Sequence, residues 1–294
     1  MGLTLATTFA KAATYCVILS GLGGEPAYEQ RFLEQTETLS AAARQLTGDE
    51  SKVVTLAGGQ ADRDSIRREL RALAAKVQPD DQVIITLIGH GSFDGEEYRF
   101  NLPGPDLTAT QLAALFDQLP AKHQLIVNAS SASGATVERW KRDGRIVITA
   151  TKSGGERTAT RFSQHWVKAL DSAKADVDKD DIVTAAEAFE YASRKVAESF
   201  RTDASLATEH ARLEGSNAGS FQVARFGTAA RVTTNPELNE MFVQRVRIER
   251  DLDAVKQRKV SLAADAYYDE LEGVLVQLAQ LQRQIDAKQL AEGE

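Results

Sequence analysis

The sequence predicts an α/β fold with a mostly parallel sheet sandwiched by helices, plus a C-terminal α-helical hairpin. Strand-like and helix-like segments alternate from Thr14 to Leu170 at the spacing of βαβ units, which favours parallel strands. The strand candidates include nearly unbroken apolar runs such as 83–88, as expected for strands buried on both faces. From Asn235 the composition changes to Leu, Glu, Arg, Gln, Lys and Ala with apolar residues near heptad spacing, which indicates long helices.

The first part of the α/β region contains alternating strand and helix candidates. Apolar segments rich in Val, Ile and Leu predict strands at 14–20, 52–56 and 82–89. Apolar residues at helical spacing predict helices at 25–46 and 62–77. The glycine-rich segment 21–24 follows the first strand, but it has neither the GxGxxG nor the GxxxxGK[ST] spacing. We therefore do not expect a nucleotide site there.

The same alternation continues towards residue 200. Asp94-Gly95 lies between alternating residues and predicts a hairpin excursion after the third strand. Thr108 is a suitable N-cap for a helix that Pro120 ends. Further strands are expected at 124–127 and 145–150, and further helices at 134–141, 161–170 and 185–200. In the C-terminal region, two long helices joined near 259–261 fit the pattern best.

These patterns divide the chain into a flexible N-terminus at 1–12, an α/β domain at 13–225 and a helical hairpin or coiled-coil arm at 235–294. The arm either packs back on the α/β domain or provides a contact for a homo-oligomer or a partner. The first residues end in Ala10-Lys11-Ala12-Ala13, which resembles the end of a secretory signal without its basic region and apolar core. The compartment is left open, with a periplasmic or secreted location expected if an upstream signal peptide is missing.

The composition is that of an ordinary globular protein and excludes several classes of function. The chain has 294 residues, enough to bury a sizeable core. A net charge of −7 and a pI near 5.3 disfavour nucleic acid as a partner. No apolar run approaches the roughly 20 residues of a transmembrane segment. The single cysteine, Cys16, excludes an intrachain disulfide and a multi-cysteine metal site, and we expect it to be a buried thiol.

Two polar clusters follow strand candidates. His90-Gly91-Ser92 follows the strand at 82–89, and residues 128–134 (NASSASG) follow the strand at 124–127. Because sites in open α/β sheets form beyond the carboxyl ends of the strands, we expect these clusters to lie together. A histidine beside a hydroxyl is a candidate pair of base and nucleophile. A turn-capping role is the alternative for His90.

The order of these motifs resembles the caspase and legumain type of cysteine peptidase (clan CD). In that family a His-Gly follows one strand, and a cysteine follows the next within Ala-Cys-x-Ser-Gly or Ser-Cys-x-Ser-Gly. Residues 130–134 (SSASG) match that cluster with Ser131 at the cysteine position. The excursion after His90 and the strand at 145–150 also match, so the resemblance covers roughly residues 14–200. It implies a caspase-like fold over 13–225 and a peptidase-type site.

The resemblance implies that His90 and Ser131 occupy the catalytic positions and that the N–H groups of Gly91 and Ser131 form an oxyanion hole. A serine hydroxyl needs a hydrogen-bonded imidazole and usually an orienting third group. The acidic residues nearest to His90 in the sequence are Asp94 and Glu96, and neither flanks it directly. Three interpretations of Ser131 stay open: natural loss in a pseudo-peptidase, an engineered Cys→Ser replacement that traps an active peptidase, or a working serine nucleophile or a site of another kind.

The loop after the strand at 145–150 also reaches the carboxyl edge of the sheet. In the peptidases that the sequence resembles, this loop shapes the substrate pocket, so Ser153, Glu156 and Arg157 are the expected pocket residues. Arg157 and Arg161 favour an acidic substrate side chain, and Glu156 favours a basic one. The sequence does not decide between them.

A separate acidic segment, 176–187 (DVDKDDIVTAAE), matches the spacing of an EF-hand calcium loop. The expected Ca²⁺ ligands are the carboxylates of Asp176, Asp178, Asp180 and Glu187 and the carbonyl oxygen of Ile182. Asp181 departs from the pattern because it stands where glycine makes the sharp turn. Ca²⁺ is the only cofactor that the sequence suggests, and an acidic helix start is the alternative.

These features favour a caspase/legumain-like peptidase homologue that binds a peptide or protein partner without efficient cleavage. An active endopeptidase seen through a Cys→Ser change, or a hydrolase that uses Ser131 and His90, is the first alternative. The second alternative is a scaffold whose helical arm drives oligomerisation.

Overall fold

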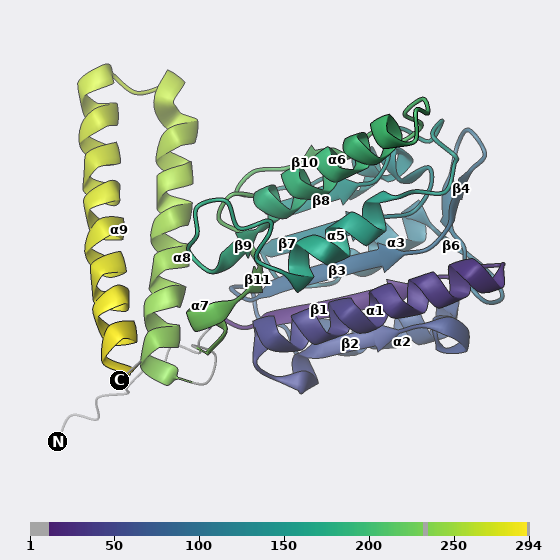
Figure 1. Ribbon diagram of the computed structural model, residues 1–294, viewed down its shortest axis with the longest axis horizontal. Helices are drawn as coiled ribbons and strands as arrows, with labels where there is room; N and C mark the ends of the chain where they lie inside the picture. Colours follow the sequence, from purple (N-terminus) through teal and green to yellow (C-terminus); the bar gives the residue numbers. More distant parts are fainter. Residues whose placement is uncertain (1–11, 232–234, 293–294) are drawn as a thin grey trace.

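The computed structural model describes residues 12–231 and 235–292 and contains a central sheet with helices on both faces (Figure 1). The strand order is β10–β8–β7–β3–β1–β2, and each neighbouring pair is parallel except β10 with β8. The strands are β1 (Thr14–Ser20), β2 (Val53–Leu56), β3 (Gln82–Ile88), β7 (His123–Asn128), β8 (Arg145–Thr149) and β10 (Arg212–Glu214). The predicted fold class is confirmed, including the C-terminal helical hairpin.

Both faces of the central strands are buried, which explains their apolar sequences. In β1, Cys16 and Ile18 belong to the core on one face, whereas Val17 and Leu19 belong to the core on the other. Cys16 is a buried free thiol, and its burial raises its pKa to about 12.

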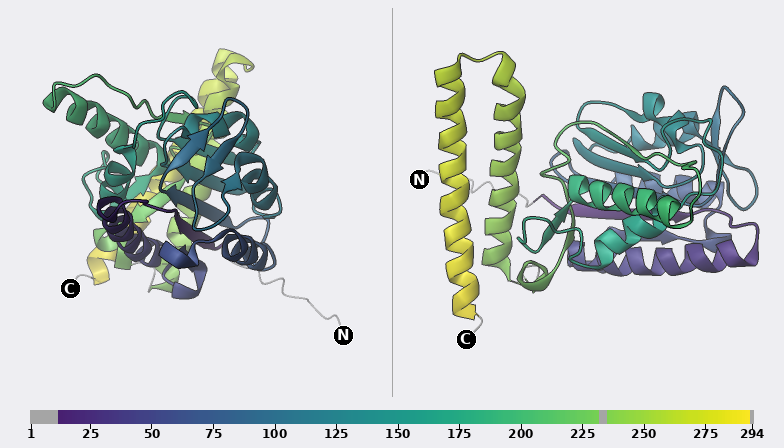
Figure 2. Two further views of the ribbon diagram at one scale, coloured as in Figure 1. Left: turned by 90° about the vertical axis from the view of Figure 1, so that its right-hand side faces the viewer. Right: turned by 45° about the horizontal axis from the view of Figure 1, so that its top comes forward.

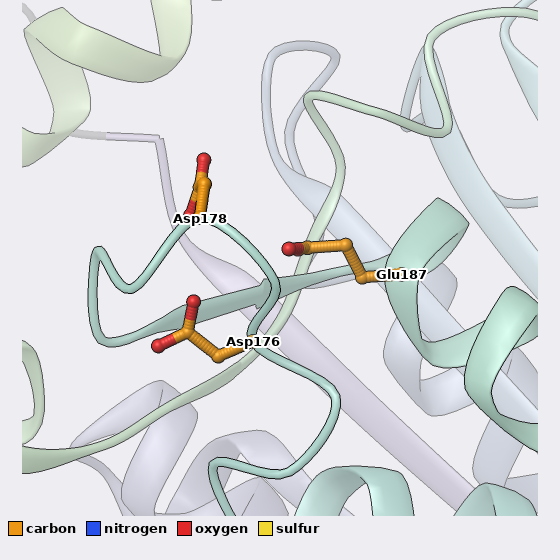
Figure 3. Close-up of side chains that lie close together, drawn as sticks. All are labelled: Asp176, Asp178 and Glu187. Atoms are coloured by element: carbon orange, nitrogen blue, oxygen red, sulfur yellow. The ribbon is translucent and has the colours of Figure 1, made fainter.

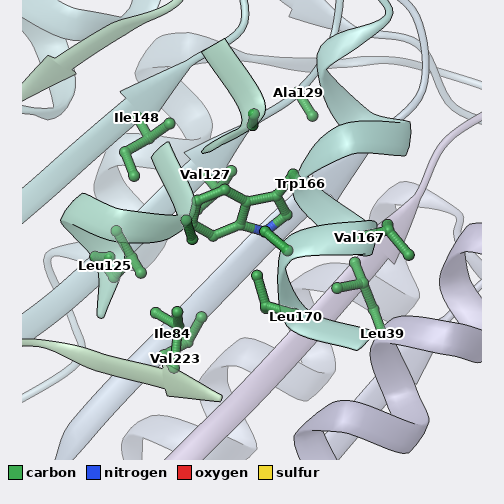
Figure 4. Close-up of a cluster of buried hydrophobic side chains, with 14 of the residues drawn as sticks. Leu39, Ile84, Leu125, Val127, Ala129, Ile148, Trp166, Val167, Leu170 and Val223 are labelled. Atoms are coloured by element: carbon green, nitrogen blue, oxygen red, sulfur yellow. The ribbon is translucent and has the colours of Figure 1, made fainter. Parts of the chain in front are cut away.

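One face of the sheet is covered by α1 (Pro26–Thr47), α5 (Phe162–Asp171) and α6 (Ala185–Thr202). Figure 4 shows the Trp166 indole of α5 among aliphatic side chains of the sheet and the neighbouring helices. A buried tryptophan removes a large apolar area from water, so this cluster is a major source of stability. Its labelled neighbours in Figure 4 are Leu39, Ile84, Leu125, Val127, Ala129, Ile148, Val167, Leu170 and Val223.

The other face is covered by α2 (Arg63–Ala74), α3 (Ala109–Phe116) and α4 (Val137–Trp140). Trp140 is fully buried and packs edge-on against Phe116 and Tyr98, and its indole N–H donates to the Ala109 carbonyl at 3.0 Å. Short 3-10 segments accompany these elements: η1 (Glu50–Lys52), η2 (Gly58–Gln60) and η3 (Ser133–Thr136). Thr108 caps α3 as predicted, through a capping box with Gln111.

The excursion after His90 is a three-stranded antiparallel sheet rather than a simple hairpin. It contains β4 (Gly91–Phe93), β5 (Tyr98–Phe100) and β6 (Leu107–Thr108). The Asp94 side chain closes the predicted turn by accepting hydrogen bonds from the N–H groups of Glu96 and Glu97. Tyr98 and Phe100 anchor the excursion in the core.

A second small sheet joins the acidic loop to the end of the α/β region. β9 (Ile182–Thr184) pairs antiparallel with β11 (Gln222–Arg225), and α7 (Gly227–Arg231) follows. The hairpin then consists of α8 (Pro236–Gln257), η5 (Arg258–Val260) and α9 (Ala264–Glu292). In Figures 1 and 2, α8 lies between α9 and the α/β region.

A separate apolar cluster packs the hairpin against β9. Ile182 of β9 lies in this cluster with Leu238 and Phe242 of α8 and with Leu281 and Ile285 of α9. The hairpin is therefore connected to the α/β region by side-chain packing as well as by the chain.

Residues 1–11 of the predicted flexible N-terminus lie outside the described residues. None of the helices in the described ranges has the length and apolar character that crossing a lipid bilayer requires.

Candidate functional site

The parallel pairing of β3 and β7 brings the two predicted motifs to one edge of the sheet. Leu87 of β3 is in register with Asn128 of β7, so His90 and Ser131 each follow their strand by the same number of residues. The N–H of Ala129 donates to the Leu87 carbonyl at 2.9 Å, which extends the pairing into the loop after β7. The topology therefore places both loops next to each other, as the sequence predicted.

The loop backbones approach so closely that the glycines of both motifs are required. A Cβ atom on Gly91 would lie 2.5 Å from the Ser131 carbonyl oxygen and 2.7 Å from Ser130 Oγ. A Cβ atom on Gly134 would overlap the backbone of Ser153, in the loop after β8. Packing among three strand-end loops thus accounts for the His-Gly and Ser-Gly pairs.

The His90 ring lies against α1. It packs edge-on against Tyr28 and Phe32, with ring centroids 4.7 Å and 5.3 Å away. Burial lowers the pKa of His90, and a hydrogen bond with the Gly23 backbone opposes that shift. The imidazole is consequently neutral at neutral pH, the form that can accept a proton.

The charged groups that act on the pKa of His90 come from α1 and the loop before it. Arg31 lowers this pKa, whereas Glu25 and Glu29 raise it. Glu29 also accepts a hydrogen bond from the Gly23 N–H at 2.8 Å, so it shapes the loop that faces His90. Asp94, which the sequence places near His90, instead pairs with Arg99 at 2.5 Å.

Ser131 is only 3% exposed and is not paired with a base. Within 12–231 and 235–292, no hydrogen bond joins His90 to Ser131, and the Ser131 hydroxyl has no hydrogen bond. The next residue, Ala132, has a φ of +55° and donates its N–H to the Glu156 carbonyl at 2.8 Å. Without an imidazole partner the hydroxyl is a weak nucleophile.

A buried hydrogen-bond network beside Ser131 was not predicted from the sequence. Tyr98 Oη lies 2.6 Å from Ser130 Oγ, which donates to Asn128 Oδ1 at 2.8 Å. Burial raises the pKa of Tyr98 to about 12. The network ties β5 to the loop after β7, and the only sequence signal for it was an asparagine at the end of an apolar strand.

Two of the three predicted pocket residues serve to hold loops together. Ser153 lies against Gly134, and Glu156 accepts backbone hydrogen bonds from Lys152 and His210 at 2.9 Å and 3.1 Å. Glu156 Oε1 also lies 2.5 Å from His210 Nδ1. Burial opposes the charged form of Glu156, but the His210 and Lys152 hydrogen bonds outweigh it and lower its pKa.

Arg157 is different, because it is exposed and has no ion pair or hydrogen bond to another described residue. Arg161, the other arginine considered from the sequence, pairs with Asp203 at 2.5 Å. Of these two arginines, Arg157 is thus the one with a charge available to a ligand.

The acidic loop brings three of its predicted ligand side chains together. Oxygen atoms of Asp176, Asp178 and Glu187 lie within 4.8 Å of one another. Figure 3 shows Glu187 reaching from the start of α6 towards the loop that carries the other two side chains. Asp181 has a φ of +65°, so the sharp turn forms although glycine is absent.

The fourth predicted carboxylate is used elsewhere. Asp180 forms an ion pair with Arg245 of α8, which also pairs with Glu249 at 2.8 Å. The remaining carboxylates are oxygen ligands of the kind that Ca²⁺ prefers, and bringing three negative charges together is costly without a cation. Three of the four predicted carboxylates thus lie close enough together to share a cation, and calcium binding itself stays a prediction.

Comparison with known proteins gives similarity only at the level of structure. No protein-family model matches the sequence, and no curated protein matches it. A Geobacter sulfurreducens protein is 12% identical over 70% of this chain and 94% of its own, with a TM-score of 0.47. Caspase-1 from Spodoptera frugiperda is 13% identical over 70% of this chain and 87% of its own, with a TM-score of 0.48. The Drosophila initiator caspase Dronc is 7% identical over 69% of this chain and 78% of its own, with a TM-score of 0.45.

Replacing Gly91 with alanine should destabilise the protein, because the new methyl group would overlap the loop after β7. We expect a loss of about 1–3 kcal/mol in the free energy of unfolding, measured by urea denaturation. Gly219→Ala is the matched control, since a Cβ atom there meets nothing within 4 Å. Equal urea midpoints for the two variants would contradict the close approach.

Millimolar Ca²⁺ should raise the melting temperature of the protein relative to an EDTA-treated sample. A ligand at a hundred times its Kd stabilises the folded state by about 2.7 kcal/mol, which corresponds to a rise of several degrees. Asp178→Asn should remove this rise without unfolding the loop, because Asp178 is exposed and has no hydrogen bond within the described ranges. Asp171→Asn, at the exposed end of α5, should keep it. An unchanged melting temperature in the unsubstituted protein would rule out the site.

Proposed function

We propose that the chain is a caspase-like peptidase homologue that binds a peptide or protein partner at the carboxyl edge of its sheet without cleaving it efficiently. The observation that carries this proposal is the equal register of His90 and Ser131 beyond β3 and β7. The close packing at Gly91 adds to it, because it holds the two loops in one arrangement.

The residues supply most of a cysteine-peptidase site but not its nucleophile. In such a site, a thiolate attacks the scissile carbonyl, the imidazole protonates the leaving amine, and backbone N–H groups stabilise the oxyanion. His90 is neutral and partly buried, as this role requires. Ser131 offers a hydroxyl in place of a thiol, and this hydroxyl has no hydrogen bond to His90 within the described residues. Peptide binding is therefore retained in this proposal while cleavage is lost.

The partner is a peptide segment that reaches the loops after β1, β3, β7 and β8. Arg157 is the proposed contact for a negatively charged group, because its guanidinium is exposed and has no ion pair within the described part of the chain. Ser153 and Glu156 act there by fixing the loop shape. The acidic loop contributes a structural Ca²⁺ site in this proposal and takes no part in the chemistry.

A second candidate function is a scaffold whose helical arm associates with a further copy of the chain. The observation that favours it is an apolar face on α9 that remains exposed, with Tyr268 at 60% and Leu275 at 45%.

Replacing Ser131 with cysteine should create peptide hydrolysis, because it restores the nucleophile within an intact site. The measurement is cleavage of a fluorogenic peptide library, and a further His90→Ala change should reduce the rate by roughly 100-fold or more. Ser133→Cys is the matched control, since it places a thiol in the same loop without expected activity. A folded Ser131→Cys protein that cleaves no peptide in the library would contradict a peptidase-type site.

The unsubstituted protein should not react with a fluorophosphonate probe, because Ser131 is only 3% exposed and its hydroxyl lacks a hydrogen-bonded base within the described residues. The measurement is mass spectrometry of the labelled peptide. Covalent labelling of Ser131 would instead support the serine-hydrolase alternative.

A further inference from the structure

Arg225 of β11 is a half-buried cation without an acidic partner. No ion pair joins its guanidinium to a carboxylate among residues 12–231 and 235–292. Burial lowers the pKa of Arg225 to about 10, and no charged group of these residues contributes to that shift. Because a charge removed from water is costly unless it is paired, the guanidinium needs an anion that these residues do not supply.

Arg145 and Arg245 show how the same fold pairs enclosed guanidinium groups. Their side chains are 1% and 10% exposed, and both contact carboxylates. Arg145 donates to Asp117 at 2.8 Å. Arg245 pairs with Asp180 and with Glu249. In the part of the chain that the structure describes, the cation at position 225 therefore has no equivalent of the partner that these two arginines have.

Gln222, on the same strand, holds the Arg225 side chain in one orientation. The Gln222 amide oxygen accepts hydrogen bonds from Nε and Nη2 of Arg225 at 3.1 Å and 2.8 Å. Because Gln222 is only 3% exposed, this acceptor is fixed in place. The Nε2 of Gln222 is also buried and has no acceptor among the described residues. The pair thus has more hydrogen-bond donors than acceptors.

The edge of the guanidinium formed by Nη1 and Nη2 is available to a ligand. Nη1 has no hydrogen bond to a described residue, and it is not one of the side-chain nitrogens that are enclosed without a partner. It therefore reaches the surface. Nη2 keeps a second N–H group, since it gives only one to Gln222. Two parallel N–H groups in one plane match the two oxygen atoms of a carboxylate.

This guanidinium lies far from the candidate site at the carboxyl edge of the sheet. The side chain of Gln45, near the end of α1, donates to the Arg225 carbonyl at 2.8 Å. Tyr28, near the start of α1, contacts His90 instead. Gln45 and Tyr28 are separated by about 25 Å along the helix axis. In Figure 1, β11 lies towards the hairpin, whereas β4, which follows His90, lies at the far end of the α/β region.

The geometry points to a carboxylate-binding site at Arg225, which takes a small ligand through one carboxylate group at the Nη1–Nη2 edge. One carboxylate matches one guanidinium in charge as well as in shape. A phosphate dianion would bring a second negative charge, and no further cation among the described residues acts on the pKa of Arg225. This carboxylate site is separate from the proposed function, because neither His90 nor Ser131 takes part in it.

Sodium acetate is the probe for this site, and the first readout is the melting temperature of the full chain in EDTA at pH 8. Acetate should raise it by several degrees relative to sodium chloride of equal ionic strength, because binding stabilises the folded state. Arg225→Met should remove this difference. Arg225→Lys should also remove it, since an ammonium group lacks the planar pair of donors. Arg71→Met is the control, because Arg71 is an exposed arginine of α2, and this variant should keep the difference.

Saturation-transfer NMR on the acetate methyl group tests the contact directly. The unsubstituted protein should transfer saturation to acetate, and formate should displace it more effectively than inorganic phosphate at equal ionic strength. The signal should fall at least fivefold in Arg225→Lys, whose fold is checked by circular dichroism. Equal melting temperatures in acetate and chloride, an acetate signal that survives in folded Arg225→Lys, or stronger displacement by phosphate would each overturn the carboxylate site.

Discussion

The candidate site depends on the close approach of two backbone segments at Gly91. A parallel sheet brings the ends of β3 and β7 to one edge, but it does not by itself press the following loops together. The missing side chain of Gly91 permits that contact with Ser130 and Ser131, and Gly134 permits the next contact with the loop after β8. Three loops are therefore packed as one unit, and the position of each polar group follows from that packing.

This packing also fixes where the two candidate catalytic side chains lie. The His90 ring is held by aromatic contacts with α1, and Ser131 lies in the loop after β7 without a hydrogen bond from its hydroxyl to that ring in the described part of the chain. A hydroxyl must share a hydrogen bond with its base to become reactive, whereas a thiol ionises more readily. The proposed loss of cleavage follows from this difference between a hydroxyl and a thiol.

The acidic loop links the α/β region to the hairpin. Its carboxylates at 176, 178 and 187 converge, while Asp180 turns away to the guanidinium of Arg245. Ile182, immediately after them, belongs to the apolar cluster of the hairpin. A single segment therefore provides a candidate cation site, an ion pair and a packing contact, and the ion pair removes one of the ligands that the sequence spacing implied.

The sequence alone determined the alternation of strands and helices, the parallel sheet and the two motifs that share its edge, because apolar periodicity and turn residues are local properties. It also showed where the long C-terminal helices lie. Only the tertiary structure decided which charged groups act on His90 and that Glu156 contacts His210 and Asp180 pairs with Arg245. It also decided that β10 pairs antiparallel with β8 and β11 with β9. These outcomes depend on contacts between residues far apart in the chain, such as Asp180 with Arg245, and no local pattern specifies them.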